Sequence, residues 1–99
     1  MPFKRISIEE AQTLIKTQEV TLLDVRDPGS FAAGNIENSI HVTNDNVQIV
    51  VNSANKDNPL IIYCYHGNSS QGAADYFSGL GFQQCYSVDG GFEEWKAKR

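Results

Sequence analysis

Short runs of consecutive apolar residues alternate along the chain with segments in which apolar residues recur three or four positions apart. The runs at 20–25 and 60–64 are nearly continuous, which is typical of strands covered on both faces. Two shorter segments, 39–42 and 85–88, have a similar character. We therefore predict four strands at these positions.

Helical spacing fills the segments between the strands. Ser7 and Glu10 form a capping box ahead of a helix that starts at Ile8. Four further helices are predicted. Ser30 can cap a short helix that runs to Gly34, and a second helix follows Asn44-Asp45, with apolar residues at helical spacing: Val47, Val50, Val51 and Ala54. A third has the same spacing at Ala73, Ala74, Phe77 and Leu80 and is ended by Gly81 as a left-handed cap, and a fourth follows the Asp89-Gly90-Gly91 turn and carries Phe92 and Trp95.

This alternation of strands and helices over short connections predicts an α/β domain with a mostly parallel sheet and helices on both faces. We expect one domain over 1–99, because 99 residues with 40% hydrophobic content suffice for a single core and leave no room for a second. Ligands of such sheets bind outside the carboxyl ends of the strands. The site is therefore expected after Val25, Val42, Cys64 or Val88.

Charge and hydropathy exclude several classes of partner. The net charge of -4 argues against nucleic acid, because binding to it depends on basic surface. No apolar run is long enough to span a membrane, and the N-terminal segment lacks the apolar stretch of a signal peptide. We therefore expect a cytoplasmic protein, in which Cys64 and Cys85 serve chemistry or packing rather than a disulfide.

The strongest chemical signal is the loop at 64–70, where Cys64 ends a buried strand and a helix follows directly. The N–H groups of a short loop and the helix dipole can converge on this sulfur, which would stabilise a nucleophilic thiolate. Gly67 would allow the strained backbone that such a loop needs. The alternative is that Cys64 is a small buried core residue. The lack of Asp and Glu between Asp57 and Asp75 supports an anionic site only weakly.

The other residues of this loop have more than one interpretation. His66 could assist anion binding or proton transfer, or it could be an exposed loop residue. Ser69 and Ser70 could donate to sulfur-bound oxygens, but helix capping is the favoured role. Asn68 suits a left-handed turn, and Tyr65 suits the rim of a pocket.

Residues outside the loop are interpreted as structural. Arg26 is expected to form an ion pair with Asp24 or Asp27, and His41 to be a hydrogen-bonded structural histidine. Phe92 and Trp95 are expected in the core. The cysteines and histidines lack the spacing of metal ligands, so we expect no metal and no other cofactor.

Four segments of the chain together resemble the rhodanese homology domain. They are Leu22-Leu23-Asp24-Val25-Arg26, Asp27-Pro28 with Ser30-Phe31-Ala32-Ala33-Gly34, the loop from Cys64 to Ser70, and Asp89-Gly90-Gly91-Phe92-Glu93-Glu94-Trp95. They occur in the order of that family and span nearly the whole chain. The resemblance is particularly strong to the small single-domain members, and it implies a rhodanese-like α/β fold with a mostly parallel five-stranded sheet.

The resemblance also implies an activity, that of a thiosulfate sulfurtransferase. The Cys64 thiolate would attack the outer sulfur of thiosulfate, release sulfite and keep a persulfide. Cyanide, a small thiol or a dithiol protein such as thioredoxin would then accept that sulfur. The implied substrate-binding residues are Tyr65, His66, Gly67, Asn68, Ser69 and Ser70, whose N–H groups can hold the persulfide and the departing sulfite without a metal.

The chain departs from the family pattern at three places. Ser30 stands where the family usually has Glu, so an ion pair from Arg26 to that position is missing. Gly34-Asn35 replaces a common Gly-His. The active loop offers His66 and hydroxyl groups where many members have Arg or Lys to attract thiosulfate.

Two other functions could use the same architecture. A cysteine phosphatase or arsenate reductase would need an Arg that closes the loop around a phosphoryl dianion, and no Arg or Lys occurs between Lys56 and Lys96. A non-enzymatic sulfur-relay or protein-interaction module would keep the fold, although the retained Cys64 favours an enzyme. Sulfur transfer on Cys64 is therefore the expected function.

The two cysteines are expected to lie at opposite ends of their strands. If these strands are parallel neighbours, Cys64 ends one and Cys85 begins the other, so that about 10 to 13 Å separate them at roughly 3.3 Å per residue. A disulfide needs Cα atoms within about 7 Å. We therefore predict that both thiols are free.

Overall fold

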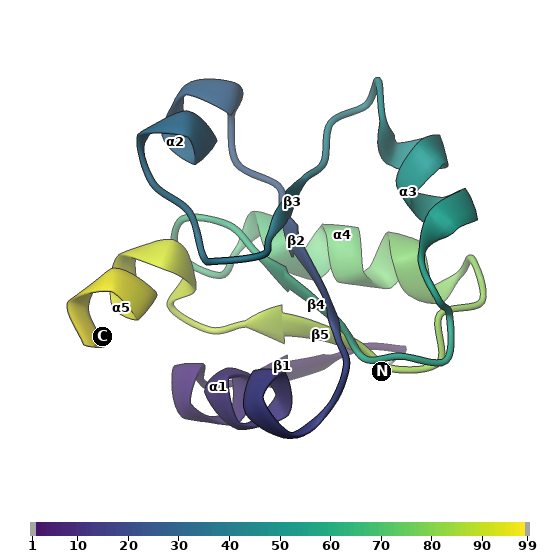
Figure 1. Ribbon diagram of the computed structural model, residues 1–99, viewed down its shortest axis with the longest axis horizontal. Helices are drawn as coiled ribbons and strands as arrows, with labels where there is room; N and C mark the ends of the chain where they lie inside the picture. The colour runs from purple at the N-terminus through teal and green to yellow at the C-terminus, as the bar shows by residue number, and fades with distance from the viewer. Residues whose placement is uncertain (1, 99) are drawn as a thin grey trace.

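The computed structural model describes residues 2–98, in which five strands and five helices alternate along the chain (Figure 1). The strands are β1 (Lys4–Ile6), β2 (Thr21–Asp24), β3 (Ile40–His41), β4 (Leu60–Tyr63) and β5 (Cys85–Val88). The helices are α1 (Ile8–Thr17), α2 (Pro28–Ala33), α3 (Val47–Ser53), α4 (Ser69–Ser78) and α5 (Gly91–Lys98). Met1 and Arg99, the ends of the predicted domain, lie outside the described residues.

The five strands form one sheet in the order β1-β5-β4-β2-β3, and every neighbouring pair is parallel. From β2 the chain moves to one edge of the sheet, and from β4 it moves toward the other edge. The direction of winding therefore changes between β2 and β4. The carboxyl ends of strands at such a switch point are the usual place for a ligand, and Cys64 follows β4 there. The predicted α/β class is confirmed.

The central strand β4 divides the interior into two cores, and its side chains alternate between them. Leu60 and Ile62 face one core, whereas Ile61 and Tyr63 face the other; all four residues have 0% exposure. The first core is completed by α3 and α4 through Val50, Val51, Ala74 and Phe77, and the second by α1 and α5 through Ile8, Ala11 and Phe92. Figure 1 shows these helix pairs on opposite sides of the sheet.

The helix ends agree with the sequence predictions in part. The capping box of α1 is confirmed: the N–H of Glu10 donates to Ser7 Oγ at 3.1 Å, and the N–H of Ser7 donates to Glu10 Oε1 at 2.9 Å. The prediction for α2 was wrong. Its N-cap is Asp27, which accepts from the N–H of Ser30 at 3.0 Å, because Pro28 at the first helical position lets the helix begin earlier.

Two further boundaries differ from the prediction. Helix α4 ends at Ser78 with Gly79 as its C-cap, so Gly81, although left-handed at φ +97°, lies in the following turn and does not cap the helix. The sequence analysis also did not identify β1. That strand has three residues, of which only Ile6 is buried, so it carries no hydrophobic period of its own.

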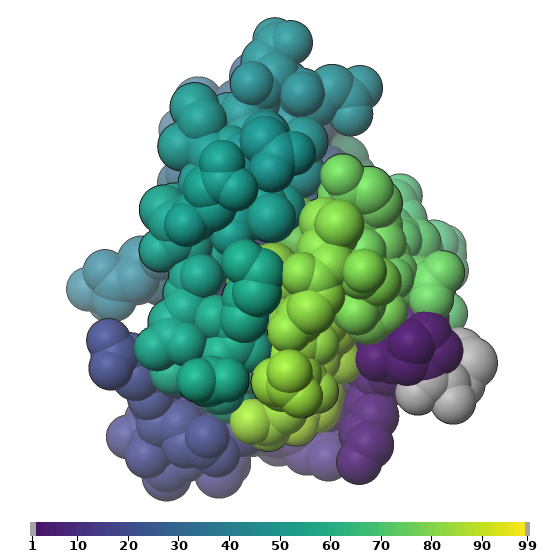
Figure 2. Space-filling view, turned by 90° about the vertical axis from the view of Figure 1, so that its right-hand side faces the viewer, coloured from purple at the N-terminus to yellow at the C-terminus, as the bar shows by residue number. Residues whose placement is uncertain are grey.

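The amino ends of the central strands are joined by the loops that precede them. The N–H of Leu60 donates to Gln84 O at 2.8 Å, and the N–H of Gln83 donates to Lys56 O at 3.1 Å. Figure 2 shows this face, with the teal segment before β4 beside the yellow-green segment before β5. The opposite, carboxyl edge of the sheet is therefore where β4 leads into the Cys64 loop.

Candidate active site

Cys64 is the first residue after β4, and α4 begins five residues later at Ser69. The side chain is buried, with 4% of the residue exposed. Its position between a fully buried strand and a helix N-terminus fixes the direction from which hydrogen-bond donors reach the sulfur. The structure therefore places this predicted residue where a helix dipole and loop N–H groups can act on it.

Three groups contact the Cys64 sulfur. The N–H of Gly67 donates to Sγ at 3.2 Å, and the N–H of Ser70 donates to it at 3.3 Å. Ser70 Oγ lies 3.4 Å from the sulfur, where it can accept from the thiol or donate to the thiolate. These contacts direct polar hydrogens at the sulfur of a buried residue.

The electrostatic balance at this sulfur favours the thiolate. Burial alone would raise the pKa of the thiol, because it removes water from the charged form. Hydrogen bonds from the Ser70 hydroxyl and from the N–H groups of Ser70, Gly67 and His66 outweigh burial, so the pKa of Cys64 lies below its ordinary value. A thiol with a lowered pKa ionises, and so becomes nucleophilic, at a lower pH than an ordinary cysteine.

Gly67 sits at the tightest point of the loop, with φ at +92°. A Cβ added there would lie 3.0 Å from both Gly90 N and Val88 O. The residue therefore needs the left-handed conformation and also the space that only glycine leaves. Gln71, one turn into α4, donates to Gly67 O at 2.9 Å and fixes the carbonyl side of this peptide.

The two serines that follow the loop have different positions. Ser69 is exposed at the start of α4, whereas Ser70 is completely buried. The favoured interpretation of Ser70 as a helix cap was wrong, because Asn68 occupies the N-cap position and the Ser70 hydroxyl points to Cys64 and to Ser87. No side-chain hydrogen bond caps α4, since the N–H group of Ser70 is used by the sulfur.

The remaining loop residues lie around the mouth of the site. Tyr65, His66 and Asn68 are all exposed, and Asn68 is right-handed (φ -90°) rather than left-handed as predicted. The rings of Tyr65 and His66 are 6.3 Å apart at the centroids. Of the six predicted substrate-binding residues, Gly67 and Ser70 have hydrogen bonds to the sulfur, whereas Tyr65, His66, Asn68 and Ser69 lie on the exposed side of the same loop.

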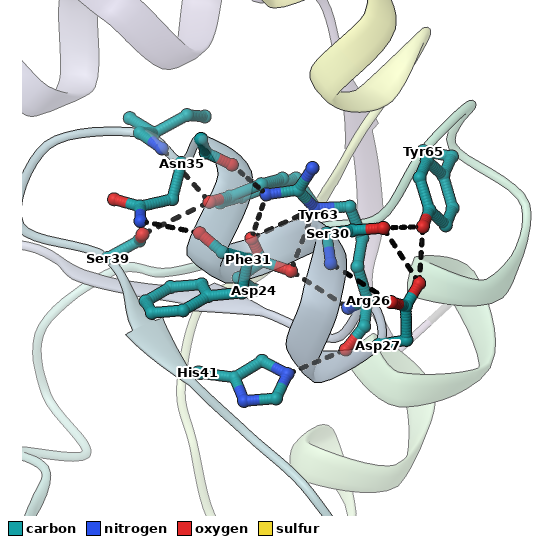
Figure 3. Close-up of polar contacts among 12 residues, drawn as sticks. Asp24, Arg26, Asp27, Ser30, Phe31, Asn35, Ser39, His41, Tyr63 and Tyr65 are labelled. Carbon is teal, nitrogen blue, oxygen red and sulfur yellow. Dashed lines mark hydrogen bonds and ion pairs between the residues drawn. The ribbon is translucent and has the colours of Figure 1, made fainter.

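Tyr65 is tethered to the neighbouring helix by a polar cluster that the sequence analysis did not identify (Figure 3). Its hydroxyl donates to Asp27 Oδ1 and contacts Ser30 Oγ, and the Ser30 hydroxyl also bonds to Asp27 Oδ1 at 2.8 Å. Hydrogen bonds from Tyr65 and Ser30 hold the pKa of Asp27 well below its usual range. The serine that replaces the family glutamate therefore helps to fix the active loop.

Arg26 forms the ion pair with Asp24 that the sequence predicted as one of two options (Figure 3). The Nη2–Oδ2 distance is 2.7 Å, and the two side chains are 3% and 0% exposed. The guanidinium also donates to Gly34 O at 2.6 Å and lies over the ring of Phe92, with Cζ 4.2 Å from the centroid. The Arg26 guanidinium is therefore engaged by Asp24, by Gly34 O and by the Phe92 ring.

His41 and the aromatic residues of α5 are structural, as predicted. His41 Nε2 is 2.7 Å from Arg26 O, and its ring stacks on Phe31. Phe92 and Trp95 pack in the core formed with α1. Within residues 2–98 no group of three or more His, Cys, Asp or Glu side chains is arranged to hold a metal ion. In the same range no helix has the length and apolar character needed to cross a membrane.

Cys85 and Cys64 are both free thiols, as predicted. In the β4–β5 ladder Cys85 is opposite Leu60, four positions before Cys64, so the two thiols lie toward opposite ends of neighbouring strands. Burial raises the pKa of the Cys85 thiol to about 11, because no N–H group stabilises its charged form as happens at Cys64.

Two cavities adjoin the carboxyl edge of the sheet. One of about 630 Å³ lies between the ends of β2 and β3 and helix α4, where its walls include Val25, Val42, Ala73, Tyr76 and Phe77. The other, of about 310 Å³, includes Arg26, Ser30, Tyr65 and Phe92 in its walls and so reaches the active loop through Tyr65.

The fold and the site together define a parallel α/β protein with a buried cysteine in a strand-to-helix loop, whose N–H groups donate to the sulfur. Within that class, the chain belongs to the rhodanese family, whose rhodanese-like domain matches residues 7–98. The resemblance drawn from the four sequence segments is confirmed.

Curated relatives have about half of their aligned residues identical to this chain. The thiosulfate sulfurtransferase GlpE of Ectopseudomonas mendocina is 50% identical over 95 residues, which cover 96% of this chain and 86% of that protein. The protein of the same name from Pseudomonas syringae pv. syringae is 50% identical over 94 residues, covering 95% and 88%. The one from Tolumonas auensis is 45% identical over 94 residues, covering 95% and 89%.

Solved structures have the same fold. The rhodanese-related protein from Thermoplasma volcanium superposes with a TM-score of 0.80 at 29% identity and covers 97% of this chain and 93% of its own. A rhodanese-like domain protein from Staphylococcus aureus also gives 0.80 at 29% identity, with 94% and 91% covered.

Proposed function

We propose that this rhodanese domain is a thiosulfate sulfurtransferase in which Cys64 carries the transferred sulfur as a persulfide. The observation that carries the proposal is the hydrogen-bonded sulfur of Cys64, which accepts from the N–H groups of Gly67 and Ser70 and has a lowered pKa. Relatives with about half of their residues identical bear the name thiosulfate sulfurtransferase, which supports thiosulfate as the donor.

The first half of the reaction loads the sulfur. The Cys64 thiolate attacks the outer sulfur of thiosulfate, a new S–S bond forms, and the S–S bond of thiosulfate breaks. The electron pair of the broken bond leaves with sulfite. One thiolate and one thiosulfate dianion thus give one persulfide anion and one sulfite dianion, so no proton and no redox partner is required.

The second half returns the enzyme to its starting state. Cyanide attacks the outer sulfur of the persulfide, which forms thiocyanate and releases the Cys64 thiolate. A thiolate acceptor would take the same sulfur and become a persulfide itself. A dithiol protein such as thioredoxin could then release sulfide by forming its own disulfide. Each acceptor uses the same attack on the same outer sulfur.

The loop from Tyr65 to Ser70 supplies the binding groups in this mechanism. Its backbone N–H groups point toward the sulfur, so they can stabilise the persulfide anion and the negative charge on the departing sulfite. His66, Asn68 and Ser69 are exposed on the same loop and are the side chains that an entering anion would meet first. Tyr65 forms the rim and is held by Asp27.

The loop is poorly suited to phosphoryl chemistry. Phosphate monoesters are held by a bidentate guanidinium, and the loop contains no Arg or Lys. Two cations line the pocket next to the loop: Arg26 is committed to the buried pair with Asp24, and Lys96 is paired with Glu93. These features favour a small sulfur donor over a phosphate ester.

We also place the activity in the cytoplasm. Low-molecular-weight thiols that can accept the sulfur occur in that reducing compartment. Cyanide accepts the sulfur in the assay, and a thiol accepts it in the cell.

The proposal is tested by thiocyanate formation from thiosulfate and cyanide. We expect the wild-type chain to turn over and Cys64→Ser to lose at least about a thousandfold of the rate, because the hydroxyl is not ionised at neutral pH. Cys85→Ala is the matched control, since it removes the other buried thiol of the same sheet and should keep the rate. Transfer that persists in Cys64→Ser would contradict the assignment.

A further inference from the structure

Behind the Cys64 sulfur lies a second buried hydroxyl that the transfer mechanism does not use. Ser87 is in β5, directly beside β4, and has 0% exposure. Its Oγ lies 2.8 Å from Ser70 Oγ, which in turn lies 3.4 Å from Cys64 Sγ. The three atoms form a chain from the middle of the sheet to the reactive sulfur.

The hydrogen atoms available to this chain can be counted for the thiolate and for the thiol form of Cys64. It has two links, Sγ to Ser70 Oγ and Ser70 Oγ to Ser87 Oγ. With a thiolate, Ser87 donates to Ser70 and Ser70 donates to sulfur, so both hydroxyl hydrogens are used. With a thiol there is a third hydrogen for the same two links, and one donor then has no acceptor within the chain.

The surroundings do not relieve that excess hydrogen. Among the described residues, the Ser70 hydroxyl is the hydrogen-bond partner that the structure gives to Ser87 Oγ. Both serines are fully buried, so water does not supply an acceptor at their surfaces. A buried donor without an acceptor is costly, and this cost falls on the thiol form. The excess is the same without Ser87, because removing Ser87 takes away one hydrogen and one link together. What Ser87 adds is a hydrogen bond to Ser70 Oγ, which leaves the Ser70 hydrogen for the sulfur.

We propose that Ser87 is a positioning residue that orients the Ser70 hydroxyl toward Cys64 and thereby favours the proton-free sulfur. The proposal rests on the proposed role of Cys64 and deepens it. In the persulfide the Cys64 Sγ also carries no hydrogen, so the same orientation fits both resting states of the transfer cycle. Ser87 acts through Ser70 and does not touch the substrate.

Other titratable groups near the loop do not take part in this chain. On the loop, on α5 and near α2 these groups are His66, which is exposed, Tyr65 bonded to Asp27, Arg26 paired with Asp24, Asp89 paired with Arg5, Glu93 paired with Lys96, and Glu94 paired with Lys98. On β4, β5 and α4 they are Tyr63 bonded to Ser39, Tyr86 bonded to Gln84, and the exposed Asp75 and Tyr76. None of them is replaced in the experiment below. Their influence on the sulfur therefore stays constant between the variants.

The test measures the rate of Cys64 alkylation by iodoacetamide against pH in a Cys85→Ala background, where Cys64 is the one remaining thiol. The midpoint of this profile is expected to rise by about one pH unit in Ser87→Ala, the equivalent of one ordinary hydrogen bond. Ser70→Ala is expected to raise it at least as far. The double variant should match Ser70→Ala alone, because Ser87 acts through Ser70.

Two results would overturn the proposal. One is an unchanged midpoint in Ser87→Ala, and the other is a double variant whose shift equals the sum of the two single shifts. Cys85→Ala itself is the matched control: it truncates a buried side chain on the same strand two residues earlier, and peptide mapping should show an unshifted Cys64 profile. Alkylation needs no sulfur donor, so this test can fail while sulfur transfer on Cys64 stands.

Discussion

The backbone N–H of Phe92 donates to the carbonyl oxygen of Cys64 at 2.8 Å. The next N–H, that of Glu93, donates to Tyr65 O at 3.1 Å. These two N–H groups lie in the first turn of α5, where they have no partner within the helix, and they hold the carbonyl groups of the first two loop residues. The sulfur is positioned by α5 as well as by α4, although α5 begins more than twenty residues after the loop starts.

Gly91 makes this contact possible, and its replacement should be costly. It has φ at +56°, and a Cβ would overlap Cys64 O and lie 2.5 Å from Tyr65 O. We expect Gly91→Ala to lower the free energy of unfolding by about 2 kcal/mol or more and to reduce sulfur transfer. Urea denaturation and the thiocyanate assay measure the two effects.

Gly72 provides the control for that variant. It lies within α4, and a Cβ there meets nothing within 4 Å. Gly72→Ala should stabilise the fold by about 0.5 to 1 kcal/mol, because alanine is the better helix former. Equal stability losses in the Gly91 and Gly72 variants would contradict the tight contact at Gly91.

The two thiols should differ in reactivity at neutral pH. An ordinary thiol is a few per cent ionised there, and the pKa of Cys64 is lower than ordinary. The pKa of Cys85 is raised to about 11, which leaves roughly one molecule in ten thousand ionised at pH 7. Limiting iodoacetamide at pH 7 followed by peptide mapping should label Cys64 at least about a hundredfold faster. Preferential labelling of Cys85 would reverse the assignment.

The tether between Tyr65 and Asp27 should be visible in the titration of the carboxyl group. The hydrogen bond from Tyr65 lowers the pKa of Asp27, so Tyr65→Phe should raise that pKa toward its ordinary value. In the wild type the stabilisation from this contact is present above the ordinary carboxyl pKa and is lost as the pH falls through the lowered value. NMR titration of the Asp27 carboxyl carbon checks the direction, and an unchanged pKa in Tyr65→Phe is the opposing result.

The buried pair of Asp24 and Arg26 should matter far more than an exposed pair. Asp24→Asn leaves a buried guanidinium without its counter-charge and should cost about 3 to 5 kcal/mol of the free energy of unfolding. Arg5, which pairs with Asp89 at the surface, is the control, and Arg5→Gln should cost less than about 1 kcal/mol. Urea denaturation of both variants measures the two free energies of unfolding. Small and similar losses of stability in both would show that the buried pair is dispensable.

The sequence predicts well those features that depend on neighbouring residues. The capping box at Ser7 and Glu10 is a local signal, and the buried strand that ends before Cys64 is recognised by its continuous apolar run. The strand β1 is not predictable in this way, because its pairing with β5 is what makes its three residues a strand.

The same difference between local and long-range features separates the site residues that the sequence predicts from those that it does not. Cys64 and Gly67 are found from the strand, the loop and the helix that follow one another in the chain. Ser87 lies 17 residues after Ser70, and it reaches the site only because β5 pairs with β4 in one particular register. The tether from Tyr65 to Asp27 spans 38 residues and depends on how α2 sits beside the loop. Long-range contacts of this kind leave no pattern in a single sequence.

The persulfide on Cys64 is tested most directly by intact-mass spectrometry. Incubation of the reduced protein with thiosulfate should add the mass of one sulfur atom, peptide mapping should place it on Cys64, and cyanide should remove it with the formation of one equivalent of thiocyanate. Cys85→Ala should behave in the same way, and Cys64→Ser should gain nothing. An unchanged wild-type mass after thiosulfate, or a sulfur atom that maps to Cys85, would contradict the mechanism.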